Sequence, residues 1–285
     1  MRLSKLHDIP GQSTRDRLEH IFSHAAGGKV FVQPKYNGIL GIWGNGAMWT
    51  RQNKRYKPGF FCPEFERPLA ALPKSLILYG ELLVPGVSFQ LAVGLLSVNR
   101  KPKCLSQMQY VLYDCFDTEI LMHEQPFSAR YNRLVSLMPM LPNAYTHLCA
   151  TTQVDSPKEA QEFRDFACDE GGYEGIVLRA EPAFICGDMP SPQIIKWKKT
   201  FDGEGTCVGV YPGTGKRTGL LGGFTVRLDN GLSLNIGGGT GLTDAQLLFY
   251  INNPPIGKKL TYTYEGLSDA GIPLKAQFVA VRDYE

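Results

Sequence analysis

The chain has 285 residues, of which 43% are hydrophobic and 20% are charged, a composition typical of a globular protein with a sizeable core. Its formal net charge of only +3 excludes binding of polyanions through net charge alone, so any basic surface has to be local. The seven cysteines form no CxxC pair and no metal-ligand spacing, which indicates reduced thiols in a reducing compartment. The N-terminal residues lack an apolar signal region and no apolar run has the length of a membrane span, so we expect neither secretion nor a membrane anchor.

Helix and strand patterns alternate through the first two thirds of the chain. Residues 13–24 have the apolar spacing of a short helix, with Leu18, Ile21 and Phe22 on one face. Strand-like apolar runs follow at residues 29–34, 39–43, 47–51, 76–84 and 110–115, and helical spacing returns at residues 63–72, 126–137 and 157–170. These patterns predict a mixed α/β domain over residues 1–200.

The character of the sequence changes after Lys199. Short β-prone runs there alternate with glycine-rich turns, which is typical of a small all-β barrel. We therefore expect a second domain at residues 201–285 and a hinge near residues 199–204.

Residues 31–40, FVQPKYNGIL, place Lys35 where a strand ends and an Asn37-Gly38 turn begins. A lysine at such a position is exposed enough to react and is held in a fixed direction. A surface lysine at a hairpin turn has the same local sequence, so the residues that follow downstream decide its meaning.

Two carboxylates and two further lysines lie on predicted strands downstream. Glu81 lies in the apolar run LYGELLVPG, where a buried carboxylate needs a partner, and Glu174 begins the run EGIVLR beside a glycine. Lys196 and Lys198 share one strand face and repel each other unless an anion lies between them. A structural salt bridge explains Glu81 equally well, and an edge strand protected by lysines explains the pair. Together with Lys35, however, these residues form a set suited to phosphoryl chemistry.

In order and spacing, KYNG, TRQNKRY, YGELLVPG, VLYDCFD, EGIVLR and IIKWKK resemble six motifs of the covalent nucleotidyltransferases. The chain from residue 30 to residue 282 resembles the minimal ATP-dependent DNA ligases. The resemblance implies an α/β (α+β) nucleotidyltransferase domain with mostly antiparallel sheets, followed by an all-β OB-fold barrel. It also implies a monomeric, cytoplasmic, bacterial or phage-like enzyme that uses ATP and Mg²⁺, or Mn²⁺, to seal nicked duplex DNA in repair, replication or recombination.

The resemblance assigns a role to each candidate residue. It implies that Lys35 is the nucleophile that attacks the α-phosphorus of ATP and becomes lysyl-AMP. Because free lysine amines are mostly protonated at neutral pH, nearby cations and the metal must favour the neutral amine. The remaining assignments are Lys196 and Lys198 at the phosphates, Glu81 and Glu174 at the metal, Glu81 and Asn37 at the ribose, Arg51 at the ribose or the nick phosphate, Tyr113 stacked on adenine, and Gln33 in adenine selection.

Three positions depart from the family pattern. Asn37 stands where the family has an aspartate, and Leu40 stands where it has an arginine that binds phosphate. In the last motif, Leu274 follows the proline where the family has another arginine. Cations that can replace these charges are Arg51, Lys54 and Arg55 in the first domain, and Lys275 and Arg282, at the leaving pyrophosphate, in the second.

Contacts with DNA are expected from basic loops that neutralise phosphates without reading sequence. Solvated surface loops have the same composition. The candidates are Arg51, Arg55, Arg100, Lys101 and Lys103 in the first domain, and Lys216 and Arg217 in the barrel.

Three other functions stay open at this point: an RNA ligase of the same superfamily, an RNA-capping guanylyltransferase, and a nonenzymatic nucleic-acid-binding protein on a ligase scaffold. The barrel-like tail disfavours most RNA ligases and capping enzymes. The presence of Lys35, Glu81, Glu174, Lys196 and Lys198 argues against a scaffold that has lost its activity.

Overall fold

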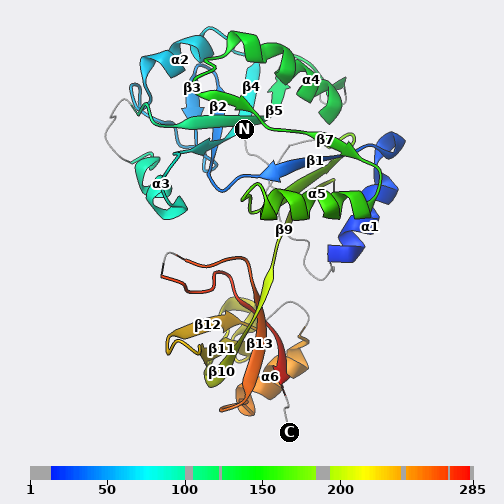
Figure 1. The fold of residues 1–285 in the computed structure, drawn as a ribbon, viewed down its shortest axis with the longest axis vertical. Helices are drawn as coiled ribbons and strands as arrows, with labels where there is room; N and C mark the ends of the chain where they lie inside the picture. Colours follow the sequence, from blue (N-terminus) through cyan, green and yellow to red (C-terminus); the bar gives the residue numbers. More distant parts are fainter. Residues whose placement is uncertain are drawn as a thin grey trace. The chain divides into compact units, whose positions relative to one another are not determined.

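The computed structural model describes residues 14–99, 105–121, 124–183, 193–238, 242–268 and 270–282 (Figure 1). The chain divides into two compact units, residues 1–198 and 199–285. Within the described ranges, none of the helices has the length and the apolar character that a transmembrane span requires.

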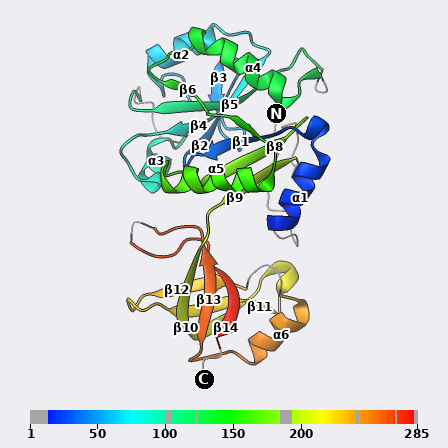
Figure 2. The same cartoon turned by 45° about the vertical axis from the view of Figure 1, so that its right-hand side comes forward.

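One sheet of the first unit has four strands in the order β7-β1-β8-β9, and all its pairs are antiparallel. The strands are β7 (Thr152–Val154), β1 (Val30–Lys35), β8 (Gly175–Ala180) and β9 (Ile194–Lys198). Helices α1 (Thr14–His24) and α5 (Pro157–Asp169) cover one face, where Leu18 and Ile21 of α1 pack on Val30, Val32 and Leu178 (Figure 2). The candidate functional site, described below, lies on the opposite face of this sheet.

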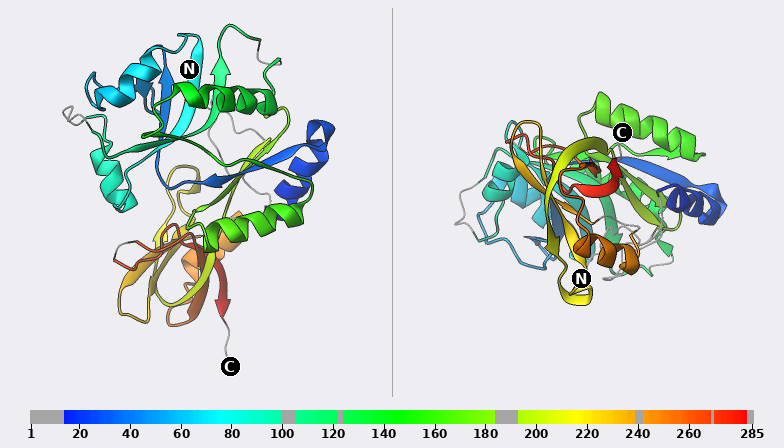
Figure 3. Two further views of the ribbon diagram at one scale, coloured as in Figure 1. Left: turned by 45° about the horizontal axis from the view of Figure 1, so that its top comes forward. Right: turned by 90° about the horizontal axis from the view of Figure 1, so that it is seen from below.

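The second sheet has five strands in the order β3-β2-β4-β5-β6. They are β3 (Ala47–Trp49), β2 (Ile39–Gly44), β4 (Leu76–Leu83), β5 (Gln109–Asp117) and β6 (Thr146–Leu148), and only β5 and β6 run parallel. Helices α2 (Pro63–Ala70), α3 (Phe89–Leu95) and α4 (Phe127–Leu137) contribute to the core on this sheet (Figure 3). Short 3-10 turns lie at Ala26–Gly28 and Met138–Met140.

The second unit is a closed five-stranded barrel in the order β10-β11-β12-β14-β13. Its strands are β10 (Phe201–Pro212), β11 (Leu221–Arg227), β12 (Ser233–Gly237), β13 (Lys259–Tyr264) and β14 (Gln277–Arg282). Helix α6 (Asp244–Asn252) closes against the barrel core through Leu247, and a 3-10 turn, η4 (Gly215–Arg217), joins β10 to β11. The predicted mixed α/β class with mostly antiparallel sheets and a small barrel is therefore confirmed.

The described elements follow the sequence patterns with a few differences. The expected strand over residues 47–51 ends at Trp49, so Arg51 lies in the following turn. Helices α3 and α6 and the short strands β6 and β7 were not predicted.

Candidate active site

The ends of three neighbouring strands bring Lys35, Glu174 and Lys198 together. Lys35 is the last residue of β1 and pairs with Gly175, the first residue of β8. Gly175 pairs on its other side with Lys198, the last residue of β9. The two lysines, 163 positions apart in the sequence, thus flank the same backbone position, next to Glu174.

Glu174 binds both lysines through one oxygen atom. The Lys35 Nζ donates to Glu174 Oε2, and the Lys198 Nζ lies 3.4 Å from the same oxygen. The Glu174 backbone N–H also donates to the Lys35 carbonyl at 3.1 Å. All three side chains are partly accessible, at 21%, 23% and 13% for Lys35, Glu174 and Lys198, so the cluster can be reached by a ligand.

Gly175 makes this convergence possible. Its φ of 154° is rare for residues with a side chain. A Cβ atom there would lie 2.3 Å from the Trp197 carbonyl oxygen and 2.6 Å from the Lys198 Cα. Any side chain at this position would therefore push β8 away from β9 and separate Glu174 from Lys198.

Glu81 lies on β4 beside the turn that follows Lys35. Burial raises the pKa of Glu81 to about 7; Lys35 opposes this rise, Glu174 adds to it, and the Gly38 N–H and Arg51 oppose it. A Cβ atom at Gly38 would lie 2.6 Å from the Glu81 Cγ, so the turn packs directly on this side chain. Glu81 therefore shares the electrostatic environment of the lysine cluster.

The two carboxylates suit a hard divalent cation. Oxygen atoms are the ligands that Mg²⁺ prefers, and it commonly binds one or two carboxylates together with substrate phosphates and water. Among the described residues, no group of three or more His, Cys, Asp and Glu side chains could hold a metal. A Mg²⁺ ion at Glu81 and Glu174 would therefore depend on the nucleotide for its remaining ligands.

Tyr113 occupies a bulge in β5. Tyr79 of β4 pairs with Asp114, whereas the next residue, Gly80, pairs with Leu112, so Tyr113 is the extra residue. Bulges redirect side chains and occur often beside active sites. The Tyr113 side chain lies with Leu40, Ile42 and Tyr79 in an apolar cluster on the five-stranded sheet.

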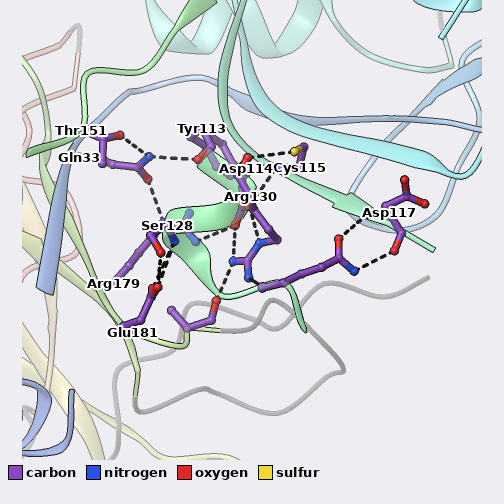
Figure 4. A network of polar contacts seen from close by, with 12 residues as sticks. Gln33, Tyr113, Asp114, Cys115, Asp117, Ser128, Arg130, Thr151, Arg179 and Glu181 are labelled. Carbon is purple, nitrogen blue, oxygen red and sulfur yellow. Dashed lines mark hydrogen bonds and ion pairs between the residues drawn. The ribbon is translucent and has the colours of Figure 1, made fainter. Parts of the chain in front are cut away.

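A buried ionic network connects β5 and α4 to β8 (Figure 4). Asp114 accepts from Arg130 Nε at 2.8 Å and Nη2 at 3.0 Å, and its second oxygen lies 3.3 Å from Arg179 Nη1. Arg179 Nε donates to Gln33 Oε1 at 2.8 Å. Burial lowers the pKa of Arg179, and the Asp114 carboxylate acts against this. The network ties the two sheets together and reaches β1 at Gln33, two residues before Lys35.

Sequence reasoning missed Arg130 and Arg179, and also Thr151, whose Oγ1 accepts from Gln33 Nε2 at 2.9 Å. Arg179 is the last residue of the run EGIVLR, so a charged residue in an otherwise apolar strand was the available signal. Its partner Asp114 is 65 positions away, and no local pattern indicates that pairing.

The other predicted residues lie as follows. Asn37 is exposed in the bend after β1, and Arg51 and Arg55 are exposed after β3. Lys196 pairs with Val177 and lies two residues before Lys198, hence on the same face of β9. Lys216 and Arg217 are exposed in η4, whereas Arg100, Lys101 and Lys103 lie outside the described residues.

The two basic residues expected at the pyrophosphate are bound to carboxylates of the barrel itself. Lys275 has a left-handed backbone, with φ of 54°, and its Nζ donates to Glu265 Oε2 at 2.8 Å. Arg282 Nε donates to Thr261 Oγ1 at 2.8 Å and lies 3.3 Å from Glu204 Oε1. These contacts would have to be exchanged before either residue could bind phosphate.

Comparisons with known proteins show which chains this one is similar to. Residues 212–282 match the family model of the DNA ligase OB-like domain. A DNA ligase of Haemophilus influenzae is 25% identical over 248 residues, which cover 87% of this chain and 84% of that protein.

Solved structures show the same fold. A Lig E DNA ligase, described as binding DNA with a minimal scaffold, matches with a TM-score of 0.70 and 22% identity over 99% of this chain and 98% of that one. The ATP-dependent DNA ligase from bacteriophage T7, in complex with ATP, matches with a TM-score of 0.50 and 18% identity over 96% and 97% of the two chains. The chain is thus similar to DNA ligases over most of its length and has the fold of their two parts, a nucleotidyltransferase domain and an OB-fold domain.

Proposed function

We propose that this DNA ligase uses ATP to seal nicks in duplex DNA, with Lys35 as the nucleophile. The observation that carries the proposal is the convergence of Lys35, Glu174 and Lys198 at three strand ends. A reactive amine, a carboxylate and a further cation at one accessible place are the groups that transfer of a nucleotidyl group requires.

In the first step, the Lys35 Nζ forms a bond to the α-phosphorus of ATP, and the bond from that phosphorus to the pyrophosphate oxygen breaks. The amine has to lose a proton, and Glu174 Oε2 already accepts a hydrogen bond from it. Lys198 and Lys196 lie on one face of β9, where they can neutralise the phosphate charge that grows in the transition state. A Mg²⁺ ion, when bound, would supply further charge neutralisation.

Two transfers complete the reaction. AMP passes from Lys35 to the 5′-phosphate of the nick, and the 3′-hydroxyl then attacks that phosphate and releases AMP. In both steps a group leaves a phosphorus atom beside Lys196 and Lys198. These two lysines therefore serve in all three steps. Because the basic residues of the exposed loops neutralise backbone phosphates, we expect DNA affinity to fall steeply with salt.

Motion between the domains belongs to the same proposal. Residues 201–204 pair with β13, so they are part of the barrel, and only Lys199 and Thr200 lie between β9 and β10. We place the hinge at these two residues. A turn there between the chemical steps would let Lys275 or Arg282 act at the pyrophosphate.

The test is covalent labelling. The protein is incubated with Mg²⁺ and either α-labelled ATP or α-labelled GTP, then separated under denaturing conditions. We expect label from ATP on the wild-type protein and none on Lys35→Ala. Lys158→Ala is the matched control, because the Lys158 side chain is 87% exposed on α5. Label that persists on Lys35→Ala would refute the assignment, and the absence of label from either nucleotide would favour a nucleic-acid-binding role.

A second assay separates DNA from RNA ligation. The OB-like match favours DNA, so a nicked DNA duplex should be sealed much faster than single-stranded RNA is joined. Similar rates on both substrates would favour the RNA ligase alternative.

A further inference from the structure

Trp197 lies between Lys196 and Lys198 on β9, and its side chain points to the opposite face of the sheet. It pairs with Ile176 of β8, and both residues belong to the apolar cluster that these strands share with α5. The indole therefore anchors the strand segment that carries both lysines to the helical layer.

The end of β9 has little other support. In the part of the chain that the structure describes, β9 is an edge strand whose only neighbour in the sheet is β8. Its last residue, Lys198, is separated from β10 of the second unit by just two residues, Lys199 and Thr200. Any movement of the second unit therefore pulls on Lys198 first. A strand end with hydrogen bonds on one side alone opens more readily than an inner strand, so its anchor matters.

Arg164 of α5 lies over the indole. Its guanidinium carbon is 4.3 Å from the centre of the Trp197 ring, which is within the range of a cation–π contact, and tryptophan is the best aromatic partner for such a contact. The Arg164 side chain is only 18% exposed, so solvent ions screen the attraction weakly. The contact thus adds an electrostatic attraction to the apolar packing of the ring.

Asp165 fixes the direction of the Arg164 side chain. Its Oδ1 accepts from Arg164 Nε at 2.9 Å and from Arg164 Nη2 at 2.6 Å. Because the N–H bonds of a guanidinium lie in the plane of the group, these two bonds leave its face open to the ring. The carboxylate therefore orients the cation without competing with the indole.

We propose that Arg164 is a positioning residue, which clamps Trp197 to α5 and so keeps the two lysines of β9 directed at the phosphate while the second unit moves. This inference rests on the proposed function, because it concerns lysines that serve in the chemical steps. Arg164 itself binds on the helix-covered face of the sheet, opposite the reacting groups. Without the clamp, the repulsion between the two lysines and the pull of the connection to β10 would draw the end of β9 away from Glu174.

The first measurement is hydrogen–deuterium exchange of the β9 amides, followed by mass spectrometry for the wild-type protein and for Arg164→Met. Methionine keeps an unbranched apolar side chain without the charge. We expect exchange in residues 194–198 to rise by about 3- to 30-fold, the loss of one partly buried cation–π contact, and exchange in β1 and β7 to stay unchanged. Unchanged exchange in β9 would overturn the inference. A rise through the whole sheet would overturn it as well, because Arg164 would then have a general structural role.

The second measurement is the rate constant of lysine labelling at saturating α-labelled ATP. Arg164→Met should be slower by about 3- to 30-fold, with the apparent KM for ATP changed by less than about twofold, because the lysines act on charge that grows in the transition state. Arg164→Lys returns a cation to the ring and should recover at least about half of the rate. The matched control is Lys158→Met on the same helix, where the side chain is 87% exposed; it should label like the wild-type protein. A wild-type rate in Arg164→Met would contradict the proposal.

A double-mutant cycle tests whether Arg164 acts through Trp197. Trp197→Leu removes the ring and should slow labelling at least as much as Arg164→Met does. An arginine without a ring to bind has no clamp left to lose, so the double variant should label no more slowly than Trp197→Leu alone. Effects that multiply in the double variant would show two independent roles and would refute the proposed clamp.

Amide exchange needs no nucleotide, so it separates this inference from the proposed function. A wild-type protein that takes no label from ATP would refute the proposed function. Faster β9 exchange in Arg164→Met would still support the clamp in that protein, and equal exchange in the two proteins would refute the clamp.

Discussion

Replacement of Asp114 by asparagine tests how far the buried ionic network supports the first unit. Asp114 is fully buried and is bound by Arg130 and Arg179, each 3% exposed. Asparagine preserves the shape of the side chain and one acceptor oxygen for the Cys115 N–H, which lies 2.8 Å from Oδ1. It removes the only negative charge that touches both guanidinium groups directly among the described contacts.

The expected cost follows from this uncompensated charge. Removing one partner of a buried ion pair typically costs about 3–5 kcal/mol, because the remaining charge stays desolvated. A domain is stable by only about 5–15 kcal/mol, so Asp114→Asn should lose a large part of that free energy. With a urea dependence of about 2 kcal/mol per molar, the unfolding midpoint should fall by about 2 M.

Tryptophan fluorescence during urea unfolding reports this effect for the first unit alone. All three tryptophans, Trp43, Trp49 and Trp197, lie within residues 1–198. The control is Asp155→Asn, the same substitution at an exposed residue, which should change the free energy of unfolding by less than about 0.5 kcal/mol. A loss of less than about 1 kcal/mol for Asp114→Asn would show that water or rearrangement compensates the arginines, and the reasoning on the network would be wrong.

Two further substitutions probe the active site. Gly175→Ala should destabilise the first unit by about 2 kcal/mol or more and abolish lysine labelling, because its Cβ would meet the Trp197 carbonyl at 2.3 Å. The control is Gly172→Ala, where φ is 66° and the space around the residue is open; it should cost only about 1 kcal/mol and keep labelling. Equal effects of the two substitutions would contradict the steric explanation. Chelation of divalent metal by EDTA should stop labelling, and Glu174→Gln should lose it even with added Mg²⁺ while its urea unfolding stays near wild type. Full ligation in EDTA would exclude a metal at this site.

The helices and strands that could be predicted from the sequence are those whose apolar residues follow a regular spacing. The β4 run was recognisable because six of its eight residues are apolar or aromatic, and α5 because Ser156 caps a regular helical spacing. Helix α6 was missed although Thr243 and Gln246 form a capping box, since its apolar residues are spread around the helix and glycine-rich turns precede it. Helix α3 was missed for a similar reason. Its exposed apolar residues Phe89, Leu91 and Val93 hide the spacing of the residues on the buried face.

The residues of the candidate site likewise differ in how far the sequence alone could predict them. The proximity of Lys35, Glu174 and Lys198 follows from their positions at strand ends, which the sequence predicted: Lys35 and Lys198 end β1 and β9, and Glu174 directly precedes β8. The Tyr113 bulge and the network under it depend on long-range pairing. A bulge adds one residue without any local composition signal except Gly80, whose Cβ would lie 2.6 Å from the Val111 carbonyl.

An apolar residue, Leu40, stands at the position where the resemblance to the nucleotidyltransferases implies an arginine. Leu40 of β2 pairs with Glu81 of β4 and packs with Ile42 and Tyr79. Arg51, in the turn after β3, is close enough to Glu81 to oppose the rise in its pKa. A positive charge therefore reaches the same carboxylate from the neighbouring turn. Arg51 is exposed in a turn that is closed by backbone hydrogen bonds from the Thr50 N–H to the Lys54 carbonyl at 2.9 Å and from the Asn53 N–H to the Thr50 carbonyl at 3.0 Å, so its charge acts on Glu81 from a backbone position outside β2.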